Sequence, residues 1–171
     1  MEPATSFSTP FLVGPGQFVV SREPGAVLST GPLGAGLAVS VYDWEAAAGG
    51  VLHALLPNSR LDRYRAEEQP GIFVDTGLAA LLEAVRKLGV GRDRFVICLA
   101  GAGQFLDGGA EFDLGGQNRA AVEAVLTGAG LKIKAAAIEG PLNRALRLQI
   151  SNGDVLVRVF PEEKEINLCQ A

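Results

Sequence analysis

The stretch Thr30-Gly-Pro-Leu-Gly-Ala-Gly-Leu-Ala-Val-Ser-Val-Tyr-Asp43 joins a glycine-rich turn to an alternating segment. From Leu37 to Tyr42, apolar residues alternate with small or polar ones, which is the period of a strand with two different faces. A second stretch, Gly49-Gly-Val-Leu-His-Ala-Leu-Leu-Pro57, is an apolar run of strand length that stops at proline, which cannot donate to a sheet. Together the two stretches predict neighbouring strands, with His53 inside the second.

The segments on either side of these strands predict the rest of the fold. Residues 72–88 carry leucine and valine at three- and four-residue spacing and precede Gly89, a pattern typical of an amphipathic helix with a glycine C-cap. A second helix is predicted at 118–127. Further strands are predicted at 17–21, 26–30, 94–100, 131–137, 145–150 and 155–160, with a hairpin turn at Asn152-Gly153 between the last two. This order favours a sheet-rich α/β domain with two helices packed on one side.

Length and composition are typical of one globular domain. The 171 residues are 48% hydrophobic and 20% charged, far from the low hydrophobicity and high charge of disordered chains. We expect a single domain over residues 1–171, with an ordered core at 11–160. The Ser/Thr/Pro-rich start, 1–10, and the charged end, 161–171, are the segments least expected to be ordered.

Charge and residue counts disfavour several classes of function. The net charge is −4, and the densest cationic stretch, Arg60–Arg65, leads into two glutamates, so nucleic acid is not an expected partner. The single histidine predicts no metal site, and the glycine-rich loop 101–109 lacks the lysine of a phosphate-binding loop, so we expect no cofactor. The sequence contains neither a secretory leader pattern nor 18 consecutive apolar residues. We therefore expect a cytoplasmic protein without membrane insertion.

His53 needs context, because a lone histidine in a strand is more often a buried core residue than a catalyst. The segments 30–43 and 49–57 resemble two motifs of the chemoreceptor glutamine deamidases of the CheD family, T-x-G-L-G-S-C-V-A-V-x-x-x-D and G-G-x-x-H-x-x-L-P, with similar spacing between them. The resemblance covers residues 13–158. Its weaker matches are Asp75, Ala100-Gly101-Ala102, Leu114-Gly115-Gly116-Gln117-Asn118, Gly140 and Arg144.

This resemblance implies a layered α/β/β sandwich of mostly antiparallel strands with two main helices on one side. It also implies hydrolysis of receptor glutamines to glutamates by a cysteine nucleophile, a histidine base and a threonine that orients the histidine. By motif match, His53 takes the base position, Thr30 the orienting position and Gly36 the nucleophile position. A thiol of pKa about 8.5 is mostly protonated at neutral pH, so the imidazole is needed to form the thiolate. Glycine offers no such thiol.

Loss of the nucleophile costs a comparable hydrolase about 10⁶ in kcat, so the family mechanism is not expected here. The chain departs from the family pattern at other positions as well, which favours natural degeneration over a single inactivating change. These positions are Pro32, Ala35, Phe73, Gln117, Ala136, Ala137 and Glu139.

Other nucleophiles stay open as alternatives. Cys98 and Cys169 lie far apart and form no CxxC motif, which is typical of a reducing compartment. Cys98 lies in an apolar run, where a buried structural thiol is expected, and nothing in the sequence brings it near His53. The hydroxyls of Ser29, Thr30 and Ser40 would each need His53 as a base in suitable geometry.

Three functional hypotheses follow. The first is a catalytically degenerate binding module for chemoreceptor helices or for a CheC-type phosphatase, two partners that the resemblance implies. The second is an active chemoreceptor glutamine deamidase that uses a substitute nucleophile. The third is a domain that serves a process outside chemotaxis.

Overall fold

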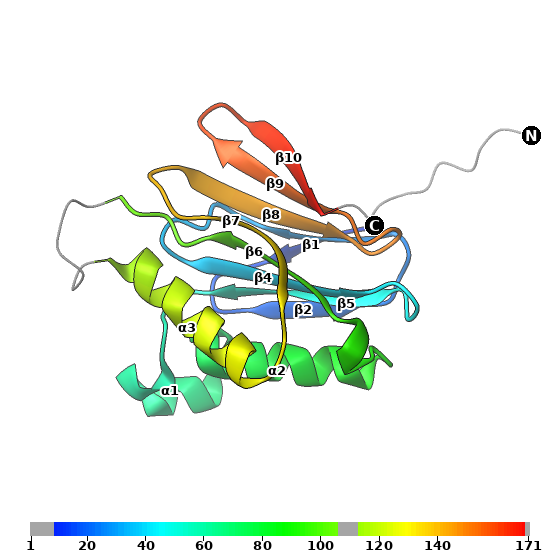
Figure 1. Cartoon of the computed structure of the whole chain (residues 1–171), viewed down its shortest axis with the longest axis horizontal. Coiled ribbons are helices and arrows are strands. Elements are labelled where there is room, and N and C mark those ends of the chain that lie inside the picture. Colours follow the sequence, from blue (N-terminus) through cyan, green and yellow to red (C-terminus); the bar gives the residue numbers. More distant parts are fainter. Residues whose placement is uncertain (1–8, 106–112, 170–171) are drawn as a thin grey trace, which may run out of the picture.

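The computed structural model describes residues 9–105 and 113–169, which form two five-stranded sheets with helices against one of them (Figure 1). The outer sheet has the strand order β1 (Thr9–Val13), β3 (Ala26–Thr30), β8 (Asn143–Gln149), β9 (Val155–Phe160) and β10 (Lys164–Cys169). The central sheet has the order β2 (Phe18–Ser21), β5 (Ala48–Ala54), β4 (Leu37–Asp43), β6 (Val96–Gly101) and β7 (Ile133–Ile138). The β1–β3 and β6–β7 pairs are parallel, and the other pairs are antiparallel.

The helices cover the face of the central sheet that points away from the outer sheet. The two main helices are α2 (Val74–Lys87), which packs on β5 and β2, and α3 (Leu114–Gly128), which packs on α2 and β4. The short elements are α1 (Arg63–Glu68) and the 3-10 turns η1 (Ser59–Leu61), η2 (Pro70–Ile72) and η3 (Arg92–Arg94). The predicted α/β/β sandwich, mostly antiparallel with two main helices on one side, is confirmed. No helix within the described ranges is long and apolar enough to cross a membrane.

Strand alternation divides the apolar side chains between two cores. On β4 and β5, Leu37 and Leu52 face the helices and pack with Leu78 of α2. The alternate residues, Ala38 and Val51, face the outer sheet and belong to the core between the sheets. His53 is two residues after Val51 and is therefore on the inter-sheet side as well.

Two predicted turns are confirmed. Gly153 has φ +71 and donates its N–H to the Gln149 carbonyl at 2.8 Å, closing the β8–β9 hairpin. Gly89 directly follows Leu88, the C-cap residue of α2, and has φ +91. This is the left-handed conformation that ends many helices, and glycine adopts it without steric cost.

The glycine pair at 49–50 opens no turn but lies inside β5, paired with both β2 and β4. A β-carbon on Gly50 would lie 2.9 Å from the Val19 carbonyl oxygen, which is backbone, and 2.7 and 2.8 Å from methyls of Val20 and Leu81. Close packing of β5 on β2 and α2 therefore requires glycine here.

The expectation of an unordered end from residue 161 is wrong for Lys164–Cys169, which form β10 on β9. The charged residues of β10 face solvent at a sheet edge, while Cys169 reaches the inter-sheet core. Strand β1 and helix α1 were also not predicted. Residues 1–8, 106–112 and 170–171 lie outside the described residues; they include most of the N-terminal segment 1–10, the last two residues of the segment 161–171 and part of the loop 101–109. The boundaries of the single domain stay a prediction.

Candidate functional site

Gly36 closes a tight turn directly before β4. Its N–H donates to the Leu33 carbonyl at 2.8 Å, and its own carbonyl accepts from the Ala102 N–H at 2.8 Å. Inside the turn, Gly34 has φ +57. Because β4 and β5 are antiparallel, with Ala38 opposite His53, position 36 lies beside the histidine at the end of the strand pair.

The space around Gly36 is narrow. A β-carbon built on this glycine would lie 3.6 Å from His53 Nε2, so the fold brings the predicted base and nucleophile positions together. The same carbon would lie 2.9 Å from the carbonyl oxygens of Ala54 and Leu33, closer than a real β-carbon approaches such atoms. Any side chain at position 36 therefore requires the backbone to move.

His53 is almost fully enclosed, with 2% of its surface exposed. Its Nδ1 lies 3.3 Å from the Val13 carbonyl oxygen, and because a carbonyl can only accept, Nδ1 carries the proton in this contact. Nε2, the nitrogen beside Gly36, is then the basic atom. Burial lowers the pKa of His53, and the Val13 carbonyl opposes this shift only in part. The imidazole is therefore neutral at pH 7 and chemically able to accept a proton.

Thr30 lies at the end of β3, with 7% of its surface exposed. Its hydroxyl accepts a hydrogen bond from the Leu146 N–H at 3.0 Å and so joins β3 to β8. In the parallel β1–β3 pair, Thr30 is the register partner of Val13, the residue whose carbonyl contacts His53. An orienting role for Thr30 stays a prediction. Sequence reasoning missed Val13, although the short apolar run Phe11–Val13 was a signal for the strand that carries it.

Asn118 of α3 is fully buried and holds both halves of the site. Its Nδ2 donates to the Ala35 carbonyl at 2.9 Å and to the Leu55 carbonyl at 3.0 Å. These carbonyls belong to the residue before Gly36 and to the second residue after His53. The Asn118 Oδ1 atom has no hydrogen-bond partner among the described residues. Sequence analysis found Asn118 only as part of a weak motif and not as a link between the two stretches.

Three loops form the rim of the site. The Gly103 N–H donates to the Gly34 carbonyl at 3.0 Å, and the Gln104 N–H donates to the Gly140 carbonyl at 2.8 Å. These bonds tie the loop after β6 to the turn before β4 and to the loop after β7. Two large apolar side chains are exposed on this rim, Phe105 at 49% and Leu142 at 43%.

The alternative nucleophiles are engaged elsewhere. Burial and the neighbouring Cys169 raise the pKa of Cys98 to about 12, so its thiol is protonated and unreactive near neutral pH. The Ser40 hydroxyl donates to the Cys98 carbonyl at 3.5 Å, in the middle of the β4–β6 pair. Ser29 alternates with Thr30 on β3 and faces the opposite side of the outer sheet.

The other positions that depart from the family pattern lie around the site and in the core. Gln117 is exposed in the first turn of α3, and Ala136 is exposed on β7. Glu139 follows β7 with φ +69, and its carboxylate pairs with Arg119 of α3. The remaining positions are exposed Pro32, half-buried Ala35 and Ala137, and fully buried Phe73. Across residues 9–105 and 113–169, no group of three or more metal-binding side chains gathers.

Comparison with known proteins gives one consistent result. A family model described as CheD chemotactic sensory transduction matches residues 55–159. A protein of Solibacter usitatus named "Probable chemoreceptor glutamine deamidase CheD" is 36% identical over 91% of this chain and 92% of its own length. A protein of Anaeromyxobacter dehalogenans with that name and the number 2 is 36% identical over 85% of this chain and 92% of its own length. A Pyrococcus horikoshii protein with the same name as the Solibacter relative is 35% identical over 90% of this chain and 94% of its own length.

Proposed function

The chain belongs to the CheD family, and we propose that it acts in cytoplasmic chemotaxis signalling as a catalytically silent module that binds chemoreceptor helices. The observation that carries this proposal is the niche at Gly36. A β-carbon there would lie 2.9 Å from two backbone carbonyl oxygens, so position 36 holds neither a thiol nor room for one. The relatives' names supply the class of partner, a chemoreceptor.

The rim offers a surface for such a partner. Phe105 and Leu142 are large apolar side chains exposed on loops that backbone hydrogen bonds hold against the Gly34 turn. Exposed apolar groups on a held loop bind with little ordering cost, and the apolar stripe of an amphipathic helix is a natural complement to them. A CheC-type phosphatase is the second candidate partner for the same rim.

The alternative is an active glutamine deamidase, a function that the relatives' names favour. His53 is retained, neutral and placed beside position 36, so one element of such an enzyme is present. A substitute nucleophile is what this alternative needs. The thiol with pKa about 12 at Cys98 and the engaged hydroxyls of Thr30 and Ser40 argue against it.

The test mixes the purified chain with a glutamine-bearing cytoplasmic fragment of a chemoreceptor from the same organism. Isothermal titration calorimetry measures binding, and a coupled assay measures ammonia. We expect saturable binding without ammonia release. Phe105→Ala should weaken binding at least about tenfold, which is 1.4 kcal/mol. Leu61→Ala is the matched control, because Leu61 is exposed at 64% but lies on η1, outside the rim.

Ammonia release that disappears in His53→Ala would establish the deamidase instead. Absence of binding to the chemoreceptor fragment and to a CheC-type phosphatase would place the domain outside chemotaxis. Equal losses in Phe105→Ala and Leu61→Ala would contradict the rim as the binding surface.

A further inference from the structure

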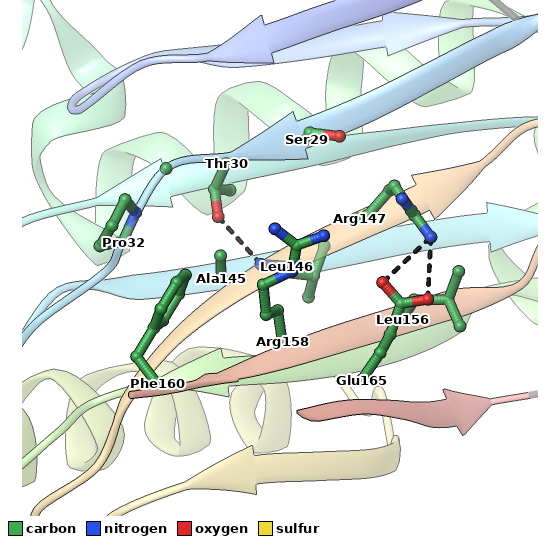
Figure 2. Close-up of a pocket in the computed structure, with 11 residues that line it drawn as sticks. Ser29, Thr30, Pro32, Ala145, Leu146, Arg147, Leu156, Arg158, Phe160 and Glu165 are labelled. Atoms are coloured by element: carbon green, nitrogen blue, oxygen red, sulfur yellow. Dashed lines mark hydrogen bonds and ion pairs between the residues drawn. The ribbon is translucent and has the colours of Figure 1, made fainter. Parts of the chain in front are cut away.

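A hollow of about 280 Å³ opens on the face of the outer sheet that points away from the central sheet (Figure 2). On β8 and β9, the side chains of Leu146, Leu148 and Val157 point into the inter-sheet core. Because side chains alternate along a strand, their neighbours point to the opposite, outer face. These neighbours include Ala145, Arg147 and Arg158, and Ser29 of β3 lies on the same face. This hollow touches the predicted site only at Thr30 and its following loop. Neither Gly36 nor His53 lines it.

The shape of the hollow follows from the sizes of its side chains. Ala145 is small and forms the floor, directly across the β8–β9 pair from Arg158. Phe160 and Pro32 form an apolar wall at one end, and Leu156 lies at the other end beside the carboxylate of Glu165 (Figure 2). A small floor between large walls leaves space for a group of a few heavy atoms.

The charges in the hollow are unequal. Glu165 is the register partner of Arg158, yet its two carboxylate oxygens accept hydrogen bonds from Arg147 Nη2 at 3.0 and 3.1 Å. Arg158 therefore has no ion pair within the described part of the chain, and its guanidinium lies between Thr30 and Arg147 (Figure 2). Arg147 Nε is buried without a hydrogen-bond partner among the described residues. The hollow thus contains two guanidinium groups and one carboxylate, so one positive charge is not compensated and some N–H donors remain free to bind a ligand.

We propose that this hollow binds a carboxylate that is carried on a short apolar chain. A guanidinium presents a planar pair of donors that matches a carboxylate, and an unpaired arginine beside apolar walls can bind both parts of such a ligand. The Glu165 carboxylate disfavours a doubly charged phosphate, since only one positive charge is uncompensated. The carboxylate belongs either to a free small acid or to an acidic side chain of a partner protein. The proposal does not depend on the proposed function of the Gly36 site.

The test uses NMR titration of the full chain at physiological salt. The free-acid probe is butyrate, with butyramide as its neutral control, and the side-chain probe is acetyl-Ala-Glu-Ala-amide, with its glutamine analogue as control. We expect saturable shifts of the Arg158 and Arg147 Nε–H signals and of the Phe160 ring with a carboxylate and not with either amide. Arg158→Gln should weaken binding by about tenfold or more, as expected for a charge-assisted hydrogen bond.

Two further variants sharpen the result. Ala145→Leu fills the floor without changing the charge and should abolish the shifts, whereas Arg22→Gln removes an exposed arginine outside the hollow and should leave them unchanged. Tighter binding of butyrate identifies a free acid as the source, and tighter binding of the peptide identifies a partner's side chain. The proposal is overturned if neither carboxylate saturates the shifts, if Arg158→Gln binds like the native chain, or if inorganic phosphate binds equally well.

Discussion

The atoms nearest to Gly36 are backbone atoms rather than side chains, and they determine whether a side chain can be accommodated at this position. The carbonyl oxygens of Leu33 and Ala54 lie 2.9 Å from the point where the first carbon of a side chain would be. A side-chain neighbour could rotate away, but these carbonyls are fixed by the turn and by β5. The histidine in the base position, His53, is therefore present, while the position beside it has no space for a side chain.

Substitution of Gly36 therefore has a predictable cost. Gly36→Ala and Gly36→Cys should each lower the free energy of unfolding by about 1–3 kcal/mol, as overpacking does, measured by urea denaturation. The new thiol in Gly36→Cys should react with iodoacetamide at pH 7 no faster than an unactivated cysteine, because the turn must distort to hold it. Cys98 should stay silent in the same assay, since its pKa is about 12.

The opposite result would be informative. Unchanged stability together with fast alkylation that requires His53 would mean that the niche accepts a cysteine and that only the nucleophile has been lost. Gly31→Ala is the matched control for glycine replacement, because a β-carbon at Gly31 meets no atom within 4 Å.

At this scale, the sequence predicted one half of the site. The family resemblance implied that Gly36 and His53 belong to one site, and the structure brings the two together. The Val13 carbonyl on Nδ1 could not be predicted, because any residue has a carbonyl and only the strand pairing selects this one. The links made by Asn118 were hidden for a similar reason, since both acceptors are backbone atoms.

Among the elements, α3 has an unusual role, because one buried side chain near its start holds two loops of the central sheet. Asn118 gives one hydrogen bond to the turn that precedes β4 and one to the segment that follows β5. The helix is also fixed at its N-terminus, where the Asp113 side chain accepts from the Gly116 N–H. Helix and site are therefore mechanically coupled.

Asn118→Ala should remove both links at once. The two carbonyls that lose their donors are part-buried, and each unsatisfied group costs about 1–3 kcal/mol, so we expect a loss of about 2–6 kcal/mol in the free energy of unfolding. Amide hydrogen exchange of residues 33–36 should speed up before global unfolding. Thr127→Ala, at an exposed position of the same helix, is the control and should change neither quantity appreciably. Unaltered exchange of residues 33–36 in Asn118→Ala would contradict the coupling.

The elements were easier to predict where a pattern repeats over many residues. α2 has leucine and valine on one face over four turns, and its prediction at 72–88 is close to the observed Val74–Lys87. β10 was missed because its residues are mostly charged and exposed, and only its pairing with β9 makes it a strand. Edge strands of this kind carry little hydrophobic pattern, since one side and one edge face water.

Over the whole molecule, two buried titratable groups connect stability to pH in separate ranges. Burial lowers the pKa of His53 in the folded protein below its ordinary value of 6.5. As the pH falls, the histidine is therefore protonated in the unfolded chain before it is protonated in the folded protein, and the free energy of unfolding decreases below about pH 6.5. For Asp43, burial raises the pKa, but hydrogen bonds outweigh it and lower the pKa overall. These bonds come from Arg94 and from the backbone N–H groups of Gly91, Ala46 and Glu45. The stability from Asp43 is thus present above about pH 4 and is lost as pH falls further.

The free energy of unfolding should therefore decrease from pH 7.5 to pH 5, with a slope of at most about 1.4 kcal/mol per pH unit, the limit for one proton. His53→Gln should flatten this slope, whatever its effect on stability at pH 7.5. Asp43→Asn should leave the slope unchanged and instead remove part of the loss below about pH 4. Urea denaturation at a series of pH values measures both effects. A slope that persists in His53→Gln would mean that another group titrates on unfolding.

The layered architecture was predictable because the order of strands and helices and the family motifs agree. The strand order within each sheet was not, since it depends on which distant segments meet. The first thirty residues and the last thirty supply all five strands of the outer sheet, which appear in blue and in orange to red in Figure 1. Strand β3 pairs with β8, whose residues follow more than a hundred positions later.

This strand order has a consequence for folding during translation. The strands of the central sheet and both main helices precede β8 in the chain, so they can collapse first as translation proceeds. Strands β1 and β3 emerge early and pair with each other, but β8, the second partner of β3, is synthesised only more than a hundred residues later. Pairings of such high contact order fold slowly. The nascent chain therefore carries an open strand edge on β3 until β8 has been synthesised, and an open edge of this kind can pair with other chains.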